Sequence, residues 1–128
     1  MVGLNPQTAR ASTGMFLIRR GDIWLIDYRP DGREGEAGQA HPGIVVSNNA
    51  NNDRAHLLQT VPLTSNIERL YVTNLVLPNQ RTGLDNDSKA QVEATRATHV
   101  SRLIKRLGFV PDDLMTELDA KLRMHFGL

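Results

Sequence analysis

Three side chains able to carry phosphate binding and proton transfer lie close together in one polar stretch of the sequence. Arg33, Glu36 and His41 occur in the glycine-rich segment 29–42, which separates two apolar runs. Such a segment is typical of a flexible, solvent-facing loop, where binding and catalytic side chains concentrate. Arginine binds phosphate, while carboxylate and imidazole groups exchange protons with a substrate. The segment is therefore the first place to expect function.

The composition indicates one soluble domain of a reducing compartment. The chain has 128 residues, no cysteine and a formal net charge of +1. Without cysteine there is neither a disulfide framework nor a thiolate metal site, so a cytoplasmic location is expected. No apolar run approaches the roughly 20 residues that cross a bilayer, which excludes a membrane function class. Residues 1–14 are small and polar and are expected to be a disordered tail before a single domain at 15–128.

The hydrophobic pattern predicts a mainly β domain that ends in a helix. Short apolar runs rich in β-branched residues are separated by Gly, Pro and Asn, and they predict strands at 23–26, 44–47, 56–63, 71–77, 89–92 and 103–107. Leu114, Leu118, Leu122 and Phe126 then recur every four residues, between Pro111 and Gly127. This order favours an α+β, mainly β fold, in which a small barrel or curled sheet packs against a C-terminal amphipathic helix.

The common catalytic signatures are missing, and neither a metal nor a cofactor is expected. There is no Walker loop, no dinucleotide fingerprint, no nucleophile elbow and no histidine pair at metal-binding spacing. Asp85 and Asp87 flank a turn, where two carboxylates usually form Asx-turns rather than an ion site. Basic residues gather between 94 and 111, and Arg96 and Arg102 among them are candidates to contact a polyanion. A solvated basic face balanced by the acidic start of the helix is the alternative.

Four motifs in order resemble the MazF/PemK toxin family. They are Arg20-Gly21-Asp22-Ile23-Trp24, then Glu36 with Gly38 and Pro42 ahead of Ile44–Asn48, then Val61-Pro62-Leu63-Thr64-Ser65-Asn66, and Gly83–Ser88 with Arg96 downstream. The resemblance runs from about Arg19 to the C-terminus. It implies an SH3-like barrel, a homodimer and a metal-independent endoribonuclease that cleaves single-stranded RNA. It also implies a cognate MazE-like antitoxin that covers the RNA groove.

The resemblance also implies roles for individual residues. Thr64 matches the active-site threonine whose hydroxyl and amide hold the scissile phosphate, although a strand-end threonine can also simply bond the local backbone. Ser65 supplies a neighbouring hydroxyl, and Glu36 stands where the family places an acid. Gln91 and Arg96 match a segment beside the RNA groove, and we expect Arg102 to join them in RNA binding. Base selectivity is expected from loops at 49–56 and 66–71.

His41 departs from the family pattern, which has its principal catalytic arginine immediately before this proline. Histidine holds phosphate less firmly than arginine but titrates near neutral pH. One hypothesis makes His41 the acid or base while Arg33 supplies positive charge. The other makes the protein a weakened nuclease that still binds RNA or an antitoxin. A relative of the fold that poisons a protein target such as gyrase is a further alternative, which the intact Thr64-Ser65 strand end disfavours.

Overall fold

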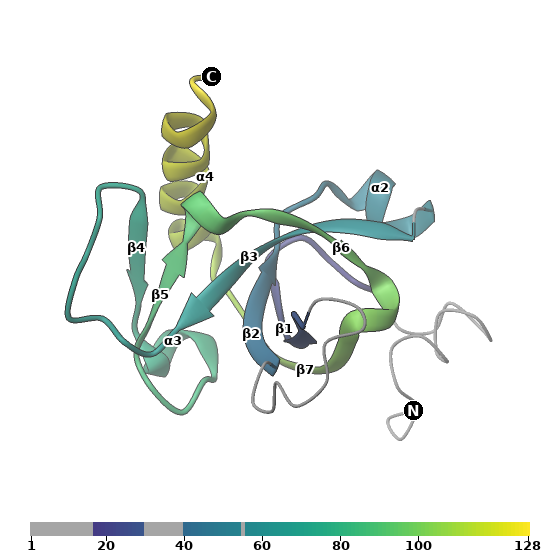
Figure 1. Ribbon diagram of the computed structural model, residues 1–128, viewed down its shortest axis with the longest axis horizontal. Coiled ribbons are helices and arrows are strands. Elements are labelled where there is room, and N and C mark those ends of the chain that lie inside the picture. Colours follow the sequence, from purple (N-terminus) through teal and green to yellow (C-terminus); the bar gives the residue numbers. More distant parts are fainter. Residues whose placement is uncertain (1–16, 30–39, 55) are drawn as a thin grey trace.

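A curved antiparallel sheet organises the chain, and the computed structural model describes it over residues 17–29, 40–54 and 56–128 (Figure 1). Seven strands follow one another as β1 Asp22–Asp27, β2 Ala40–Val45, β3 Leu57–Thr64, β4 Asn74–Leu77, β5 Ser88–Gln91, β6 Arg96–His99 and β7 Leu103–Phe109. The helical elements are α2 Asn49–Arg54, α3 Asn79–Thr82, the 3-10 turns η1 Val92–Ala94 and η2 Val100–Arg102, and α4 Asp112–Phe126. The expected tail at 1–14 lies outside the described residues.

The strands form a small barrel with an extension. Their order is β4-β5-β3-β2-β1-β7, and β6 pairs with the first half of β3. The turn η2 leads from β6 directly into β7, which pairs with β1 at the other end of this order. Among the described strands β6 and β7 are joined only by this turn and not by a hydrogen-bonded ladder, so the barrel is open between them and β7 keeps an unpaired edge. Strands β4 and β5 extend the sheet on the side where α4 stands.

Two hydrophobic cores hold the fold together, one on each face of the central strands. Ile23, Ile44 and Val61 lie side by side across β1, β2 and β3, and all three are fully buried. They pack toward Leu114 and Leu118 of α4. The residues of the second core, inside the barrel, are Ile18, Trp24, Ile26, Val45, Leu58, Val100 and Leu103. Each fully buried aliphatic side chain contributes about 1.5–3 kcal/mol.

The C-terminal helix forms as the sequence predicts. Pro111 is its N-cap, Asp112 and Asp113 occupy the first turn, and Gly127 ends it in the left-handed conformation at φ 73°. The acidic first turn offsets the positive end of the helix dipole. Phe126, the last member of the four-residue repeat, is 57% exposed. The helix therefore runs past the edge of the core it covers.

Three sequence expectations about local structure need correction. His41 lies within strand β2, which begins at Ala40, and not in a loop. Residues 49–54 form helix α2, so a base-reading loop over 49–56 was the wrong prediction. Strand β6 was missed because its four residues, Arg96 to His99, have only one buried side chain. Trp24 is 3% exposed and belongs to the core inside the barrel.

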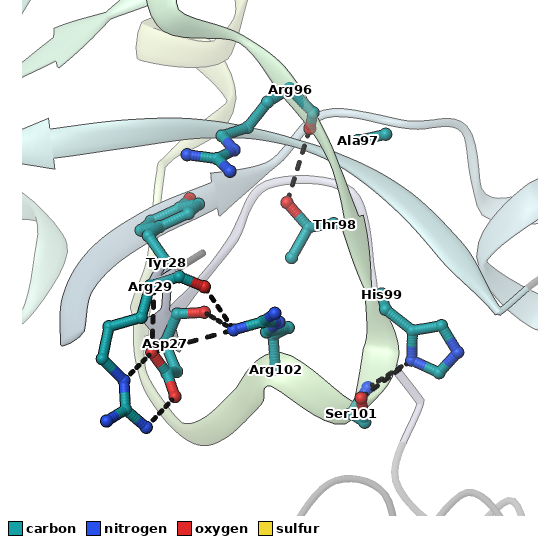
Figure 2. A pocket seen from close by; sticks show the side chains of 9 residues that line it. All are labelled: Asp27, Tyr28, Arg29, Arg96, Ala97, Thr98, His99, Ser101 and Arg102. Atoms are coloured by element: carbon teal, nitrogen blue, oxygen red, sulfur yellow. Dashed lines mark hydrogen bonds and ion pairs between the residues drawn. The ribbon is translucent and has the colours of Figure 1, made fainter. Parts of the chain in front are cut away.

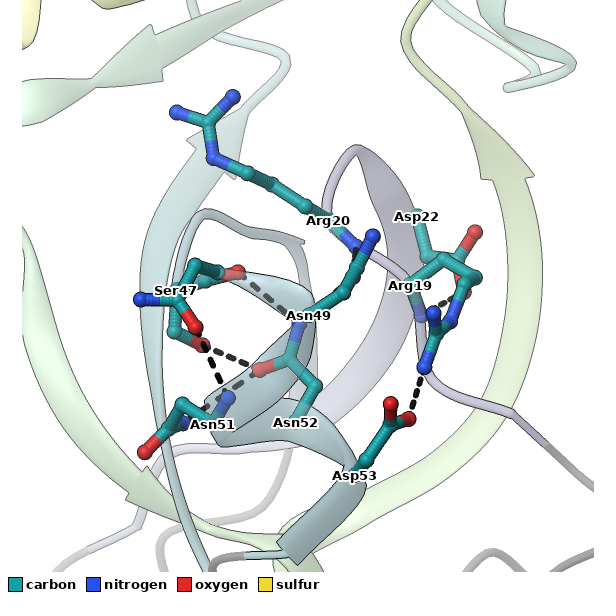
Figure 3. Close-up of polar contacts among 9 residues, drawn as sticks. Arg19, Arg20, Asp22, Ser47, Asn49, Asn51, Asn52 and Asp53 are labelled. Atoms are coloured by element: carbon teal, nitrogen blue, oxygen red, sulfur yellow. Dashed lines mark hydrogen bonds and ion pairs between the residues drawn. The ribbon is translucent and has the colours of Figure 1, made fainter.

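Helix α2 is short, and polar side chains rather than apolar ones hold it in place (Figure 3). Asn52 is fully buried, and its amide donates to the Ser47 carbonyl at 2.9 Å while the Ser47 hydroxyl donates to its Oδ1 at 2.6 Å. The Arg20 backbone N–H donates to Asn49 Oδ1 at 2.7 Å, and Arg19 forms an ion pair with Asp53. Buried polar groups with all partners present fix one arrangement, so α2 is a rigid support for β3.

Two glycines stand where a neighbouring group leaves no room for a Cβ atom. A Cβ on Gly43 would lie 2.2 Å from Tyr28 Oη, and a Cβ on Gly108 would lie 2.0 Å from the Thr82 backbone oxygen. The second contact joins β7 to the end of α3. It therefore fixes the position of the turn that follows α3.

We expect Gly108→Ala to lower the free energy of unfolding by about 1–3 kcal/mol, because the added methyl group must displace a backbone carbonyl. Urea unfolding followed by circular dichroism measures the change. Lys105→Ala, an exposed position on the same strand, is the matched control and should shift the free energy by less than about 0.5 kcal/mol. A Gly108→Ala protein as stable as the control would contradict the contact.

Candidate active site

The register of β2 and β3 directs His41 and Thr64 to the two sides of one opening. Gly43 is paired with Pro62, and the two strands are antiparallel. Two residues further along each strand, the same register places His41 across from Thr64. There, however, the pairing with β2 has already ended, because its last pair is Gly43 with Pro62, while on its other edge β3 pairs with β5 at Leu63 and Thr64. The end of β2 and the end of β3 therefore diverge and leave a hollow between them.

That hollow is a pocket of about 380 Å³, and it contains two of the four predicted catalytic residues, His41 and Thr64. Its lining combines the ends of β2 and β3 with the turn after α3 and one side chain of β7, namely His41, Pro42, Leu63, Thr64, Ser65, Gly83, Leu84, Asp85, Asn86, Ser88 and Leu107. His41 and Ser65 are exposed at its mouth, and Thr64 is half-buried. The pocket is thus accessible to a substrate from solvent.

The rim of the pocket is built by the turn after α3. Gly83 ends α3 at φ 87°, a conformation that glycine adopts readily. Asp87 accepts a hydrogen bond from the Asn79 backbone N–H at 2.8 Å, and the Asn79 amide donates to the Asp85 carbonyl at 3.2 Å. Gly108 packs against the same turn. These contacts hold Leu84, which lines the pocket between Gly83 and Asp85, opposite the strand ends.

The hydroxyl of Thr64 accepts a hydrogen bond from the nearby backbone and can still donate its own proton. Its Oγ1 accepts a hydrogen bond from the Asn66 backbone N–H at 3.2 Å, which is the local backbone bond expected of a strand-end threonine. A hydroxyl that accepts one bond still has its proton to donate. Within the described part of the chain, this proton has no recorded acceptor. Thr64 is therefore oriented by the backbone and able to donate to an anion.

Two carboxylates lie beside the pocket, and one of them stabilises the turn after α3. Asp87 bonds the first residue of α3, and Asp85 is exposed at the rim. Among the residues that the structure describes, no group of three or more His, Cys, Asp or Glu side chains is arranged to hold a metal ion.

The described part of the chain also contains no helix that is long and apolar enough to cross a membrane.

A second pocket, of about 470 Å³, contains the two arginines predicted to bind RNA (Figure 2). Arg96 of β6 and Arg102 of η2 line it, together with Asp27, Tyr28 and Arg29 at the end of β1; Ala97, Thr98, His99 and Ser101 complete the lining. The structure therefore separates these arginines from the pocket that contains Thr64.

Arginine–aspartate contacts shape one wall of this second pocket. The Arg29 guanidinium binds the Asp27 carboxylate through two nitrogens, at 2.8 and 3.0 Å. Hydrogen bonding from Arg29 is the largest cause that lowers the pKa of Asp27 to about 2. Arg102 donates to the backbone oxygen of Arg29 at 2.6 Å. Arg102 therefore braces the residue from which segment 30–39 begins, a structural role alongside the predicted RNA contact.

A chain of buried hydroxyl groups supports the opposite wall. Tyr28 Oη and Thr60 Oγ1 are 2.8 Å apart, and Thr60 Oγ1 is 2.8 Å from Thr98 Oγ1. Thr60 is fully buried and Thr98 is 5% exposed. Burial is the main cause that raises the pKa of Tyr28 to about 12, so its phenol stays protonated and neutral. The Arg96 guanidinium lies over the Tyr28 ring, with Cζ 5.2 Å from the ring centroid.

The structure thus brings together some of the residues that the sequence singled out and separates others. His41, Thr64 and Ser65 share one pocket, while Arg96 and Arg102 share another. Gln91 ends β5 opposite Asn74 and lines neither pocket. Arg33 and Glu36 lie outside the described residues, so their roles stay predictions.

Sequence reasoning missed the pair Asp27 and Arg29 and the position of Tyr28. A signal was present, because the two opposite charges stand two residues apart at a strand end, where both side chains fall on the same face. Tyr28 stands between them as an aromatic residue with a polar tip, a type that usually finds a hydrogen-bond partner when buried.

Comparison with known proteins supports the same fold and family. The model of the PemK-like, MazF-like toxins of type II toxin-antitoxin systems matches residues 19–126. "Endoribonuclease MazF9" of Mycobacterium tuberculosis is 37% identical over 117 residues, which cover 88% of this chain and 98% of that protein. The solved MazF of Deinococcus radiodurans matches with a TM-score of 0.71 at 24% identity, over 88% of this chain and 99% of the other.

A third relative was solved in a complex. It is an endoribonuclease with its cognate antitoxin from a mycobacterial species, which matches with a TM-score of 0.69 at 23% identity, over 86% of this chain and 95% of that chain. The structural matches confirm the predicted mainly β fold with a C-terminal helix.

The ion pair of Asp27 predicts a pH dependence of stability. Its folded pKa of about 2 lies below the ordinary 3.8, so between those values the unfolded chain binds more protons and stability falls as pH falls. Asp27→Asn should therefore be less stable than the wild type at pH 6, and the gap should be smaller at pH 3. Urea unfolding at both pH values measures it, with Glu117→Gln as control. A gap of equal size at both pH values would argue against the pair.

Proposed function

Because the chain belongs to the PemK-like, MazF-like family of toxins of type II toxin-antitoxin systems, we propose that it is an endoribonuclease that cuts single-stranded RNA without a metal ion. The observation that carries the proposal is the meeting of His41 and Thr64 in one solvent-accessible pocket. A relative named as an endoribonuclease, identical at 37% of positions, supports the same activity.

The chemistry proposed is an internal transfer on the RNA backbone. The 2′-oxygen of the ribose before the cut attacks phosphorus, and its proton passes to a base of the protein. The bond from phosphorus to the 5′-oxygen breaks, and an acid of the protein protonates that oxygen. The products are a 2′,3′-cyclic phosphate and a 5′-hydroxyl end. DNA is not a substrate, because it lacks the attacking hydroxyl.

The described residues supply two of the parts that this reaction requires. Thr64 donates its free hydroxyl proton to a phosphate oxygen, where negative charge grows in the transition state. His41, exposed at the mouth of the same pocket, transfers a proton as acid or base. Ser65 adds a second hydroxyl beside Thr64. Arg33 and Glu36 stand in segment 30–39, which joins Arg29 to Ala40 just before His41, and we propose that they supply charge and the second proton-transfer group.

The proposed partners follow from the family. We propose a cognate MazE-like antitoxin, because a relative of the same fold was solved with its own antitoxin. We propose a homodimer as well. It is supported by the sheet-end strand β7, which leaves Ile104 and Phe109 43% and 53% exposed. RNA as substrate is consistent with a cytoplasmic location.

The direct test incubates the purified protein with a long RNA in EDTA and analyses the new ends. We expect cuts that carry 2′,3′-cyclic phosphate and 5′-hydroxyl groups, and none in DNA of the same sequence. Activity that needs an added divalent cation would overturn the metal-independent mechanism. Intact RNA together with inhibited DNA supercoiling would favour a toxin that acts on gyrase.

Thr64 gives the sharper mutational test. Thr64→Ala should lower the rate of cleavage by about 10²–10³-fold, the usual effect of removing one donor to developing charge. Thr64→Ser retains the hydroxyl and should remain within about tenfold of the wild type. Single-turnover cleavage of a labelled RNA measures both rates. Equal rates for the alanine and serine variants would remove the hydroxyl from the mechanism.

His41 decides between the two hypotheses that the sequence left open. If its imidazole transfers a proton, His41→Ala should reduce the rate by about 10²–10⁴-fold. His41→Arg restores a phosphate-binding charge without a group that titrates near neutral pH, so it should recover binding of RNA more than cleavage. Rates and RNA affinities of the three proteins are compared. Unchanged cleavage by His41→Ala would exclude His41 as acid or base.

A further inference from the structure

Arg96 presents a flat, positively charged surface to solvent in a pocket that the proposed cleavage chemistry does not use. We propose that this second pocket holds one unpaired nucleotide of the RNA, with its base stacked on the outer face of the Arg96 guanidinium. The proposal rests on the proposed function, since that function makes single-stranded RNA the ligand. It adds a base contact that contributes to the choice of the cleavage site.

The stacking arrangement is already half formed in the protein. The Arg96 guanidinium lies over the Tyr28 ring, with Cζ 5.2 Å from the centroid (Figure 2). Tyr28 cannot move away easily, because its hydroxyl is bound to the fully buried Thr60. Arg96 itself is exposed, and among the described residues its guanidinium makes no ion pair. Its guanidinium therefore lies over a ring that is held in place, and it is open to a ligand.

The charge of the pocket favours a polyanion over a neutral ligand. Its lining contains the arginines Arg29, Arg96 and Arg102 and a single carboxylate, Asp27. The formal excess is positive even though Arg29 is paired with Asp27. The volume of about 470 Å³ falls within the range of small-ligand pockets. A nucleotide of single-stranded RNA combines a negative phosphate with a flat base that matches these two properties.

The position of the pocket fits one RNA strand that also occupies the active site. Arg96 is paired with Thr60 of β3. Thr64 lies four residues further along this strand, so the Cα atoms of Thr60 and Thr64 are about 13 Å apart. Asp27 of the second pocket is paired with Ala40, the neighbour of His41. Both pockets therefore lie at the same end of the β1–β2 pair, within reach of neighbouring nucleotides.

A base on arginine differs from a simple phosphate contact in what it requires of the side chain. Unpaired RNA bases stack on planar guanidinium groups and aromatic rings. Lysine retains the charge for a phosphate but has no plane on which a base can stack. Arg96→Lys is therefore expected to lose the base contact and to retain electrostatic attraction.

The experiment scans an RNA for the base that fills the pocket. The wild-type cut is first mapped in a long RNA. Labelled octamers of that sequence then carry 2′-deoxyribose at the cut, which blocks cleavage, and an abasic ribose at one other position at a time. Fluorescence anisotropy measures the dissociation constant of each octamer for the full-length wild type, for Arg96→Lys, and for the control Arg123→Lys, an exposed arginine on α4.

We expect one abasic position to weaken wild-type binding about tenfold, the usual worth of a stacked base. Arg96→Lys should lose this penalty at that position alone, and Arg123→Lys should retain it. The proposal is overturned if no position carries a penalty, or if Arg96→Lys retains it. It is also overturned if Arg96→Ala lowers the salt dependence of binding with an unchanged abasic profile, because that result indicates a phosphate contact only.

If the protein is not a nuclease, the first step of this experiment shows it, because the wild type then makes no cut in the long RNA. The same scan is then made on octauridine, where the test concerns binding alone. A penalty that depends on Arg96 supports the base pocket there as well, and its absence from that scan rejects it.

Discussion

The fold and both pockets depend on the way strand β3 divides its hydrogen bonds among three partners. Its first half pairs with β6, its middle with β2 and its last two residues with β5. Because β3 leaves β2 at Leu63, the antiparallel register that brings His41 toward Thr64 ends in an open hollow and not in a closed ladder. The buried hydroxyl of Thr60 fixes the strand where β6 crosses, by bonding Tyr28 and Thr98.

Much of the fold follows from the sequence, for clear physical reasons. The apolar runs that became β1, β3 and β4 and the four-residue period of α4 reflect burial against one core, which leaves a strong pattern. Strand β6 and helix α2 leave none, since β6 buries only Thr98 and α2 only Asn52. Elements held by polar contacts with distant residues, such as Asn49 with the Arg20 backbone N–H, cannot be found from hydrophobic periodicity.

The residues of the candidate site could be predicted from the sequence, but the position of strand β6 relative to them could not. His41 and Thr64 were expected to act together because both match active-site positions of the family, and they line one pocket. Arg96 was expected beside the RNA groove, and its strand pairs at Thr60 and places it in a separate pocket. Which strand β6 joins is set by pairing between residues far apart in the sequence, and local pattern carries no information about that choice.

The central claim is that one ribose-phosphate unit is held between the ends of β2 and β3. The most direct measurement is a crystal structure of the protein with an RNA whose 2′-hydroxyl at the cut is removed. The account predicts a scissile phosphate oxygen within about 3 Å of Thr64 Oγ1, with the His41 ring on the same side of the pocket. A scissile phosphate bound elsewhere, with this pocket empty of RNA, would contradict it.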